Sequence, residues 1–144
     1  MEGSLKDLIP LRMEKSKSKF KTAKHLLAEG DFDGAVPPAY YAIFHAARAA
    51  LITKGLNPIT HKGVKSMFAL HFIKPGLVEK EYQKILTDAK ELREDSDYEE
   101  DVIITQENAE GVVTDAQRFI ERIVKERGHK ERGQIFILDS FRNM

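Results

Sequence analysis

Apolar residues recur at alternating spacings of three and four along most of the chain, which is the period of an α-helix. The first such series predicts a helix over about residues 5–29, and Gly30 is placed to end it. Its seam positions are Ile9, Met13, Ser16, Phe20, Ala23 and Leu27. A stripe this narrow predicts a helix that presents one face to a core.

A second helix is predicted to be the most buried one. Of residues 39–52, 12 of 14 are apolar, and the exceptions are His45 and Arg48. A helix that is apolar nearly all round belongs at the centre of its fold. Because proline is well tolerated in the first turn of a helix, Pro37 or Pro38 is predicted to mark the start.

Three further helical series follow. One begins after Thr60, which can cap it, and one follows the break at Pro75 and Gly76. The last begins after Thr105 and is predicted to end at Gly128. In chain order, the positions that hold the helical spacing in these series are Val64, Met67, Phe68, His71 and Phe72, then Val78, Tyr82, Ile85, Ala89 and Leu92, then Ala109, Val112, Ala116, Phe119 and Ile123.

Together the series predict an all-α fold, an antiparallel up-and-down bundle of four to five helices. We expect residues 1–128 to form the bundle. Residues 129–144 are expected to form a short C-terminal extension, whose apolar run Ile135–Leu138 docks on the bundle or on a second copy. The acidic stretch 93–101 contains no glycine to turn the chain between alternating ligands, so it predicts a solvated, frayed helix end or loop rather than a cation site.

Composition narrows the class of protein. The chain has 144 residues, no cysteine and a formal net charge of zero. This length buries a core without disulfides, and the lack of cysteine excludes thiolate metal sites. No apolar stretch approaches the ~20 residues that cross a bilayer, and no signal peptide is evident, so we expect a cytoplasmic protein with no membrane partner. The high charge and the scarcity of Asn and Gln agree with a heat-adapted source.

Charge is divided unevenly along the chain. Residues 1–75 carry 12 Lys and Arg against 6 Asp and Glu, whereas residues 76–144 carry 11 against 17. This polarity permits contact with an anionic partner or head-to-tail contact between copies. On the first helix, Lys17, Lys21 and Lys24 form a stripe opposite the apolar seam. We interpret the stripe as a solvated face, with a nucleic-acid backbone contact as the alternative.

Candidate chemistry concentrates on the second helix. Tyr41, His45 and Arg48 are spaced to share one face, where Tyr41 can hydrogen-bond the imidazole and Arg48 can hold an anion beside it. A histidine near neutrality beside a cation can bind or cleave a phosphodiester. The alternative is a histidine at the core edge, satisfied by Tyr41 or by a backbone carbonyl. No histidine spacing suits a metal and no glycine-rich phosphate loop is present, so we expect neither metal nor cofactor.

Three segments carry a resemblance to a known family. They are AYYAIFHAARAAL at residues 39–51, THKGVKSMF at 60–68 and REDSDY at 93–98. Their order and spacing resemble the HEPN family (higher eukaryotes and prokaryotes nucleotide-binding domain) across about residues 5–127. The resemblance implies a helical bundle, usually a homodimer, that binds nucleotide or RNA, often as the partner of a minimal nucleotidyltransferase in a toxin–antitoxin pair. Other members are metal-independent endoribonucleases whose signature is Arg, four to six residues, then His.

One departure from the family pattern bears on activity. An Arg commonly stands immediately before Ala-Tyr-Tyr in this branch, and here that position is Pro38. His45 therefore lacks the cation that the ribonuclease signature would supply. We expect a binding module without efficient catalysis. The alternatives are an endoribonuclease that uses His45 with Arg48 or Arg93, and a purely structural dimerising bundle.

The resemblance also implies a set of ligand-binding residues. Arg93 is expected to pair with Asp97 and to face the His45 helix. The full set is Tyr41, His45, Arg48, His61, Lys62, Arg93, Asp97 and Tyr98. The literal signature also occurs once elsewhere, at Arg122 and His129, where chance alone gives about one match for so short a motif.

Overall fold

The computed structural model describes residues 3–98 and 101–130. Five α-helices and no strand occur in these residues: α1 (Leu8–Ala28), α2 (Phe32–Ile52), α3 (His61–Phe68), α4 (Lys80–Tyr98) and α5 (Gln106–Lys130). The short turn η1 (Leu5–Asp7) precedes α1, and the π-helical segment η2 (Ala69–Ile73) continues α3. The all-α class predicted from the sequence is confirmed. The apolar run at 135–138 lies outside the described residues.

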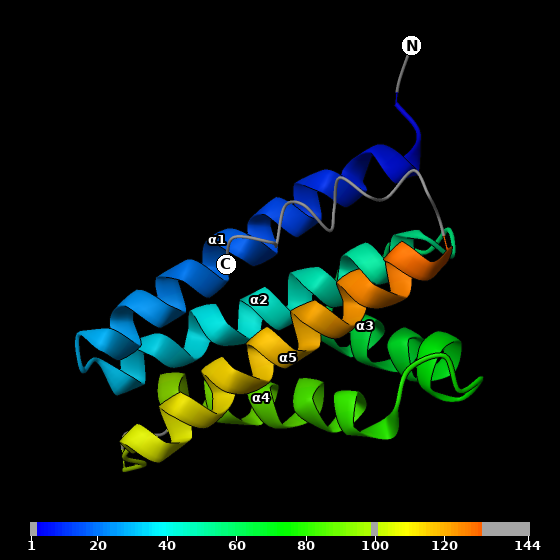
Figure 1. Ribbon diagram of the computed structural model, residues 1–144. Helices are drawn as coiled ribbons and strands as arrows, with labels where there is room; N and C mark the ends of the chain where they lie inside the picture. Colours follow the sequence, from blue (N-terminus) through cyan, green and yellow to red (C-terminus); the bar gives the residue numbers. More distant parts are fainter. Residues whose placement is uncertain (1–2, 99–100, 131–144) are drawn as a thin grey trace.

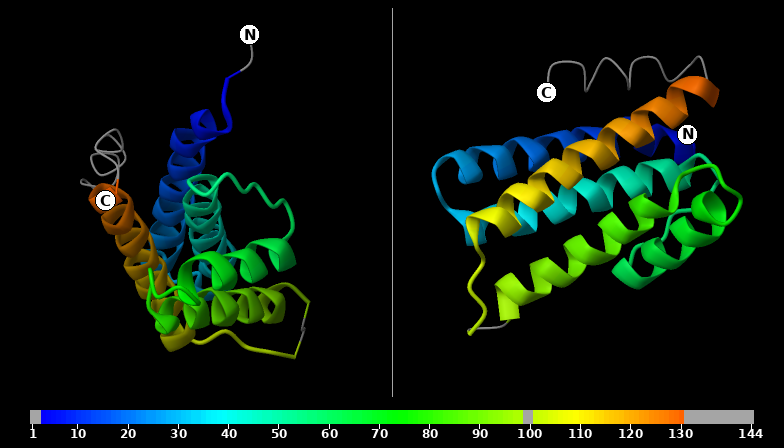
Figure 2. Two further views of the ribbon diagram at one scale, coloured as in Figure 1. Left: turned by 90° about the vertical axis from the view of Figure 1, so that its right-hand side faces the viewer. Right: turned by 60° about the horizontal axis from the view of Figure 1, so that its bottom comes forward.

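The long helices run up and down around α2. Helices α1 and α2 are antiparallel neighbours, α5 lies along α2, and α4 runs antiparallel to α5 (Figure 1). Figure 2 shows α3 beside α4, on the opposite side of α2 from α1. Helix α2 contacts all four other helices, so the central place predicted from its composition is confirmed.

The predicted apolar seam of α1 packs against α2. Ile9, Met13, Ser16, Phe20 and Ala23 are all buried. The hydroxyl of Ser16 donates a hydrogen bond to the carbonyl of Ala42 at 2.6 Å. This bond satisfies the one polar side chain of the seam and sets Ser16 level with Ala42 where the two helices meet.

The helix ends predicted from capping residues are largely confirmed. Gly30 has a φ of +81°, and the next amide, that of Asp31, donates to the carbonyl of Leu26 at 2.9 Å. This pattern closes α1 with a left-handed residue that glycine adopts without strain. The hydroxyls of Thr60 and Thr105 each accept the amide three residues on, at 2.9 and 3.0 Å.

The predicted start of α2 is wrong. The helix begins at Phe32, where the carboxylate of Asp31 accepts the amide of Gly34 at 2.9 Å. Pro37 and Pro38 therefore lie within the helix rather than in its first turn. The carbonyls that lose a donor to these prolines lie four residues earlier, in the first turn, where side chains are exposed or half-buried. The strong aspartate cap outweighs the local preference of the prolines.

Of two other predicted boundaries, one agrees with the structure in part and one is wrong. The stretch 93–101, predicted as a frayed helix end or loop, contains the end of α4 at Tyr98. Helix α4 continues through residues 93–98. Two ion pairs lie along this part of the helix: Lys90–Glu94 at 3.0 Å and, about one turn later, Arg93–Asp97 at 3.2 Å. Pairs at this spacing stabilise a helix that its acidic composition alone does not favour. Helix α5 continues past Gly128 to its end at residue 130. One glycine costs a helix about 1 kcal/mol, which is too little to stop it.

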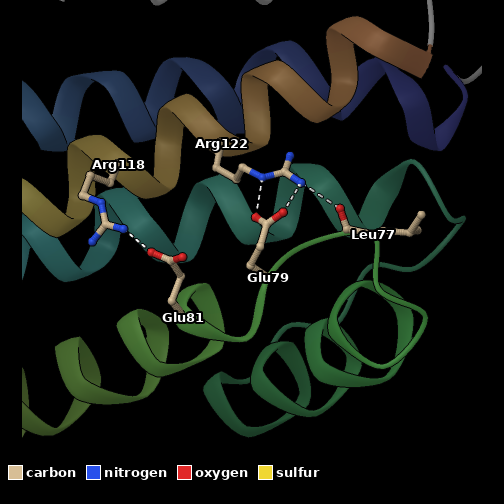
Figure 3. Close-up of polar contacts among 5 residues, drawn as sticks. All are labelled: Leu77, Glu79, Glu81, Arg118 and Arg122. Carbon is tan, nitrogen blue, oxygen red and sulfur yellow. Dashed lines mark hydrogen bonds and ion pairs between the residues drawn. The ribbon is translucent and has the colours of Figure 1, made fainter.

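Polar contacts join α5 to the segment that enters α4. The Nε of Arg122 donates to a carboxylate oxygen of Glu79 at 2.8 Å, and its Nη2 donates to the carbonyl of Leu77 at 2.9 Å (Figure 3). One turn earlier on α5, Arg118 pairs with Glu81. These contacts hold α4 and α5 together on the side of the bundle away from α1.

Candidate functional site

One face of α2 carries three predicted site residues. Tyr41 and His45 are half-buried, and Arg48 is only 8% exposed, the sole buried charged side chain in the part of the chain that the structure describes. The guanidinium of Arg48 donates to the side-chain oxygen of Asn57 at 3.1 Å and lies 5.8 Å from the ring centroid of Phe44. Arg48 is therefore anchored by the loop that follows α2.

The expected hydrogen bond between Tyr41 and His45 does not form. The two ring centroids are 6.4 Å apart, and the buried Nδ1 of His45 has no hydrogen-bond partner among the described residues. The ring of Tyr41 instead lies beneath the guanidinium of Arg93, at 5.3 Å. A cation over an aromatic face holds the tyrosine on the α4 side of the site.

A neighbouring tyrosine makes the hydrogen bond to histidine. The hydroxyl of Tyr40, which is fully buried, lies 2.6 Å from Nδ1 of His61, the first residue of α3. The His61 ring also packs against Phe44, with centroids 4.7 Å apart, and lies 6.0 Å from Tyr41. Thus α3 delivers His61 to the same aromatic cluster that carries Tyr41.

Helix α4 completes the site from the other side. Arg93 pairs with Asp97 at 3.2 Å while its guanidinium covers Tyr41. The predicted Arg93–Asp97 pair, and its position facing the His45 helix, are confirmed. We call Tyr41, His45, Arg48, His61 and Arg93 the α2 patch.

His45 is a neutral imidazole among cations. Burial lowers its pKa, and Lys15, Arg12, Arg48 and Lys19 lower it further, to about 4. Burial also lowers the pKa of Arg48, and the charge of Arg12 adds to this effect. The side of α2 that faces α1 therefore carries several basic side chains around an uncharged ring.

The Tyr40–His61 pair is uncharged at neutral pH. Burial and the neighbouring Tyr41 raise the pKa of Tyr40 above its usual range. Burial lowers the pKa of His61, and the cations Arg93 and Lys90 lower it further. The hydrogen bond therefore joins two neutral groups within an apolar cluster.

Several predicted residues do not join the α2 patch. Lys62 is exposed and has no described contact with it. Arg122 is held by Glu79 and Leu77, so it belongs to the link between α4 and α5. The side chains of Tyr98 and His129 lie outside the described residues.

Residues that the sequence reasoning missed surround the patch. They are Tyr40, Phe44, Asn57, Arg12, Lys15 and Lys19. A signal for part of this set exists in the sequence, because residues 12, 15 and 19 have the spacing of one helix face beside the apolar seam. Nothing in the sequence indicates that Tyr40 rather than Tyr41 reaches a histidine on another helix.

The α2 patch combines aromatic rings, neutral imidazoles and guanidinium groups. Aromatic faces stack on nucleobases, and guanidinium groups bind phosphate oxygens in pairs. Within residues 3–98 and 101–130 no three His, Asp or Glu side chains gather as metal ligands would. No helix in that part of the chain is long and apolar enough to cross a membrane.

Comparisons with known proteins give one family model and several relatives that match most of the chain. The family model described as "HEPN domain" matches residues 9–127. Two proteins of Methanocaldococcus jannaschii that carry the name "Putative toxin" are 40% and 30% identical over 125 residues, which is 87% of this chain and 92% and 85% of theirs. A "UPF0332 protein" of Thermotoga maritima is 37% identical over 103 residues, covering 72% of this chain and 78% of its own.

Proposed function

The chain belongs to the HEPN domain family, and on that premise we propose that it is a nucleotide- or RNA-binding module of a toxin–antitoxin pair. The toxin names of the two Methanocaldococcus relatives support the second half of this proposal. The structure of the α2 patch supports the first half.

The observation that carries the proposal is the gathering of three helices on Tyr41. Its half-buried ring has His45 on its own helix, His61 of α3 at 6.0 Å, and the Arg93 guanidinium at 5.3 Å. An aromatic ring beside a guanidinium group and two neutral imidazoles suits a nucleotide, whose base stacks while its phosphate pairs with the guanidinium.

Two observations favour binding over catalysis, the pKa of His45 and the residue at position 38. Its pKa of about 4 lies well below the range near neutrality in which a general acid or base works best. Position 38, where the family pattern commonly has Arg, holds a buried proline. The second candidate function, metal-independent endoribonuclease activity, is favoured by the neutral state of the His45 imidazole, which leaves a free base beside Arg48.

The experiment is a thermal-shift titration of the purified chain against nucleotides and short RNAs without added metal, followed by a gel of the RNA. A ligand at 100 times its Kd raises the free energy of unfolding by roughly 2.7 kcal/mol, which gives a clear shift in Tm. Arg93→Ala and His45→Ala test the site, and His25→Ala, an exposed histidine on α1, is the matched control.

The outcomes separate the functions. A Tm shift with intact RNA, weakened in Arg93→Ala and kept in His25→Ala, supports the binding module. RNA cut by the wild-type chain and left intact by His45→Ala establishes the endoribonuclease instead. The absence of both a shift and cleavage contradicts both functions and leaves a structural dimerising bundle.

The proposal includes two protein partners, a minimal nucleotidyltransferase and a second copy of the chain. Both come from the family resemblance, and the relatives named as toxins support a paired system. Co-expression with a nucleotidyltransferase encoded beside this gene should give a complex that co-purifies. Light scattering on the isolated chain should give twice its 16.4 kDa mass.

A further inference from the structure

The register of α1 against α2 brings basic residues to His45. Helices α1 and α2 are antiparallel, and the Ser16–Ala42 hydrogen bond of 2.6 Å sets these two residues level. Arg12, one turn before Ser16, therefore lies level with the turn of α2 that contains His45. Lys19, nearly one turn after Ser16, lies level with the turn that contains Pro38.

The cations on this side of the α1–α2 pair are Arg12, Lys15, Lys19 and Arg48, and we call them the cation track. All four lower the pKa of His45, in agreement with the register that the Ser16–Ala42 hydrogen bond sets. None of them pairs with an acidic side chain in residues 3–98 and 101–130. Like charges gathered without an acidic partner repel one another and destabilise the free protein. A bound anion would relieve this repulsion.

Three nitrogen atoms at this place are buried and have no hydrogen-bond partner among the described residues. They are Nε of Arg12, Nδ1 of His45 and Nε of Arg48. A buried polar atom without a partner is costly and rare in folded proteins, and a bound water or ion commonly satisfies it. Guanidinium groups bind phosphate oxygens through charge-assisted hydrogen bonds, and the proposed function makes a phosphate group the anion to expect at this place.

We infer that the cation track binds the phosphodiester backbone of a single RNA strand beside His45, an inference that rests on the proposed function. The track extends along α1 from Arg12 to Lys19, over roughly 10 Å of helix, which is longer than one phosphate group needs. In this arrangement α1 supplies the positive charge that an arginine at position 38 provides in the family pattern. Arg12 is the phosphate ligand from α1, and the lysines extend the contact along the strand.

The test compares Arg12→Gln with Lys21→Gln, which removes the same charge from another face of α1. The first probe is an oligouridylate without terminal phosphates. Arg12→Gln should weaken binding at least about tenfold, as expected for the loss of a charge-assisted contact, whereas Lys21→Gln should weaken it less than about twofold. Arg12→Gln should leave the Tm of the free protein unchanged or raise it, because a repelling charge is removed.

A second probe separates the strand from a lone phosphate group. Uridine monophosphate should bind more weakly than the oligouridylate by at least about tenfold if several phosphates contribute. Equal affinity for the two ligands overturns the strand assignment. Equal losses in Arg12→Gln and Lys21→Gln overturn the role of Arg12, as does a lowered Tm of Arg12→Gln without loss of affinity.

A third probe keeps this inference distinct from the proposed function. Inorganic phosphate should shift the imidazole NMR signals of His45 in the wild-type chain and shift them less in Arg12→Gln. If the oligouridylate does not bind but phosphate gives this pattern, the proposed function fails while the anion site at Arg12 stands. If RNA binds while phosphate leaves His45 unmoved, the proposed function stands and the cation track is overturned.

Discussion

The charge state of His45 distinguishes this residue from an ordinary surface histidine. Its ring is half-buried and its Nδ1 has no described partner. Burial, together with cations from two helices, lowers its pKa to about 4. A bound phosphate would reverse the electrostatic effect of those cations, because an anion beside the ring favours its protonated form. His45 is therefore suited to report or to assist the binding of an anion.

The pH dependence of stability should reveal this state. The folded-state pKa of about 4 lies below the ordinary 6.5, so the unfolded chain takes up a proton that the folded chain refuses. Stability is therefore full above pH 6.5 and falls as the pH drops towards 4, by about 1–3 kcal/mol. Denaturant unfolding at pH 6.5 and 4.5 measures the loss, which His45→Gln should reduce and His25→Gln should leave unchanged. Equal losses of stability in all three proteins would show that the pKa of His45 is not lowered in the folded chain.

The Tyr40–His61 hydrogen bond should stabilise the junction of α2 with α3. Tyr40→Phe removes the hydroxyl and leaves Nδ1 of His61 without a partner, which should lower the free energy of unfolding by about 1–2 kcal/mol. The matched control is Tyr82→Phe, because the half-buried Tyr82 makes no hydrogen bond through its hydroxyl in the described structure. Urea unfolding of both variants gives the comparison, and equal effects would refute the stabilising role.

At the scale of single elements, the predictable features were those set by local pattern. The seam of α1 and the caps at Thr60 and Thr105 follow from spacing and side-chain chemistry, and all are confirmed. The start of α2 was not predictable from local pattern, because its two prolines favour a later start than the Asp31 cap produces. Contacts with α1, α3, α4 and α5 keep this helix continuous despite the lost hydrogen bonds.

The link between α4 and α5 should prove structural. Side-chain exposure is 17% for Arg122, which binds Glu79 and a carbonyl. It is 46% for Arg118, which pairs with acidic side chains and lies over the ring of Tyr82. Arg122→Ala should therefore lower the free energy of unfolding by about 1–3 kcal/mol, and Arg118→Ala by less than about 1 kcal/mol. Neither change should alter RNA affinity or any cleavage. A loss of RNA binding in Arg122→Ala alone would restore the Arg122–His129 signature as a functional site.

At the scale of the whole molecule, the candidate site depends on contacts between distant segments. The sequence predicted the fold class and most site residues of α2, because these follow from helix period and from the HEPN resemblance. It did not predict that α1 supplies Arg12 or that Tyr40 reaches across to α3, because the register between helices depends on packing such as the Ser16–Ala42 contact. Part of the basic excess in the first half of the sequence lies in the cation track.

Salt dependence should measure how many phosphates the track engages. Each phosphate contact on a single strand contributes a slope of about −0.7 to the plot of log K against log salt, so four cations give about −3 at most. Arg12→Gln should make the slope shallower by about 0.7, and Lys21→Gln should not change it. Fluorescence anisotropy of a labelled oligouridylate over a range of salt concentrations gives these slopes. Binding that does not respond to salt would contradict a backbone contact.

The most direct measurement is an NMR map of the chain titrated with an oligouridylate. The largest shifts should lie in residues 12–19 of α1 and 41–48 of α2, with the imidazole signals of His45 and His61 moving in the same titration. RNA that binds while these residues stay unmoved, with the shifts confined to α5, would show that the ligand site does not lie on the His45 side of the bundle.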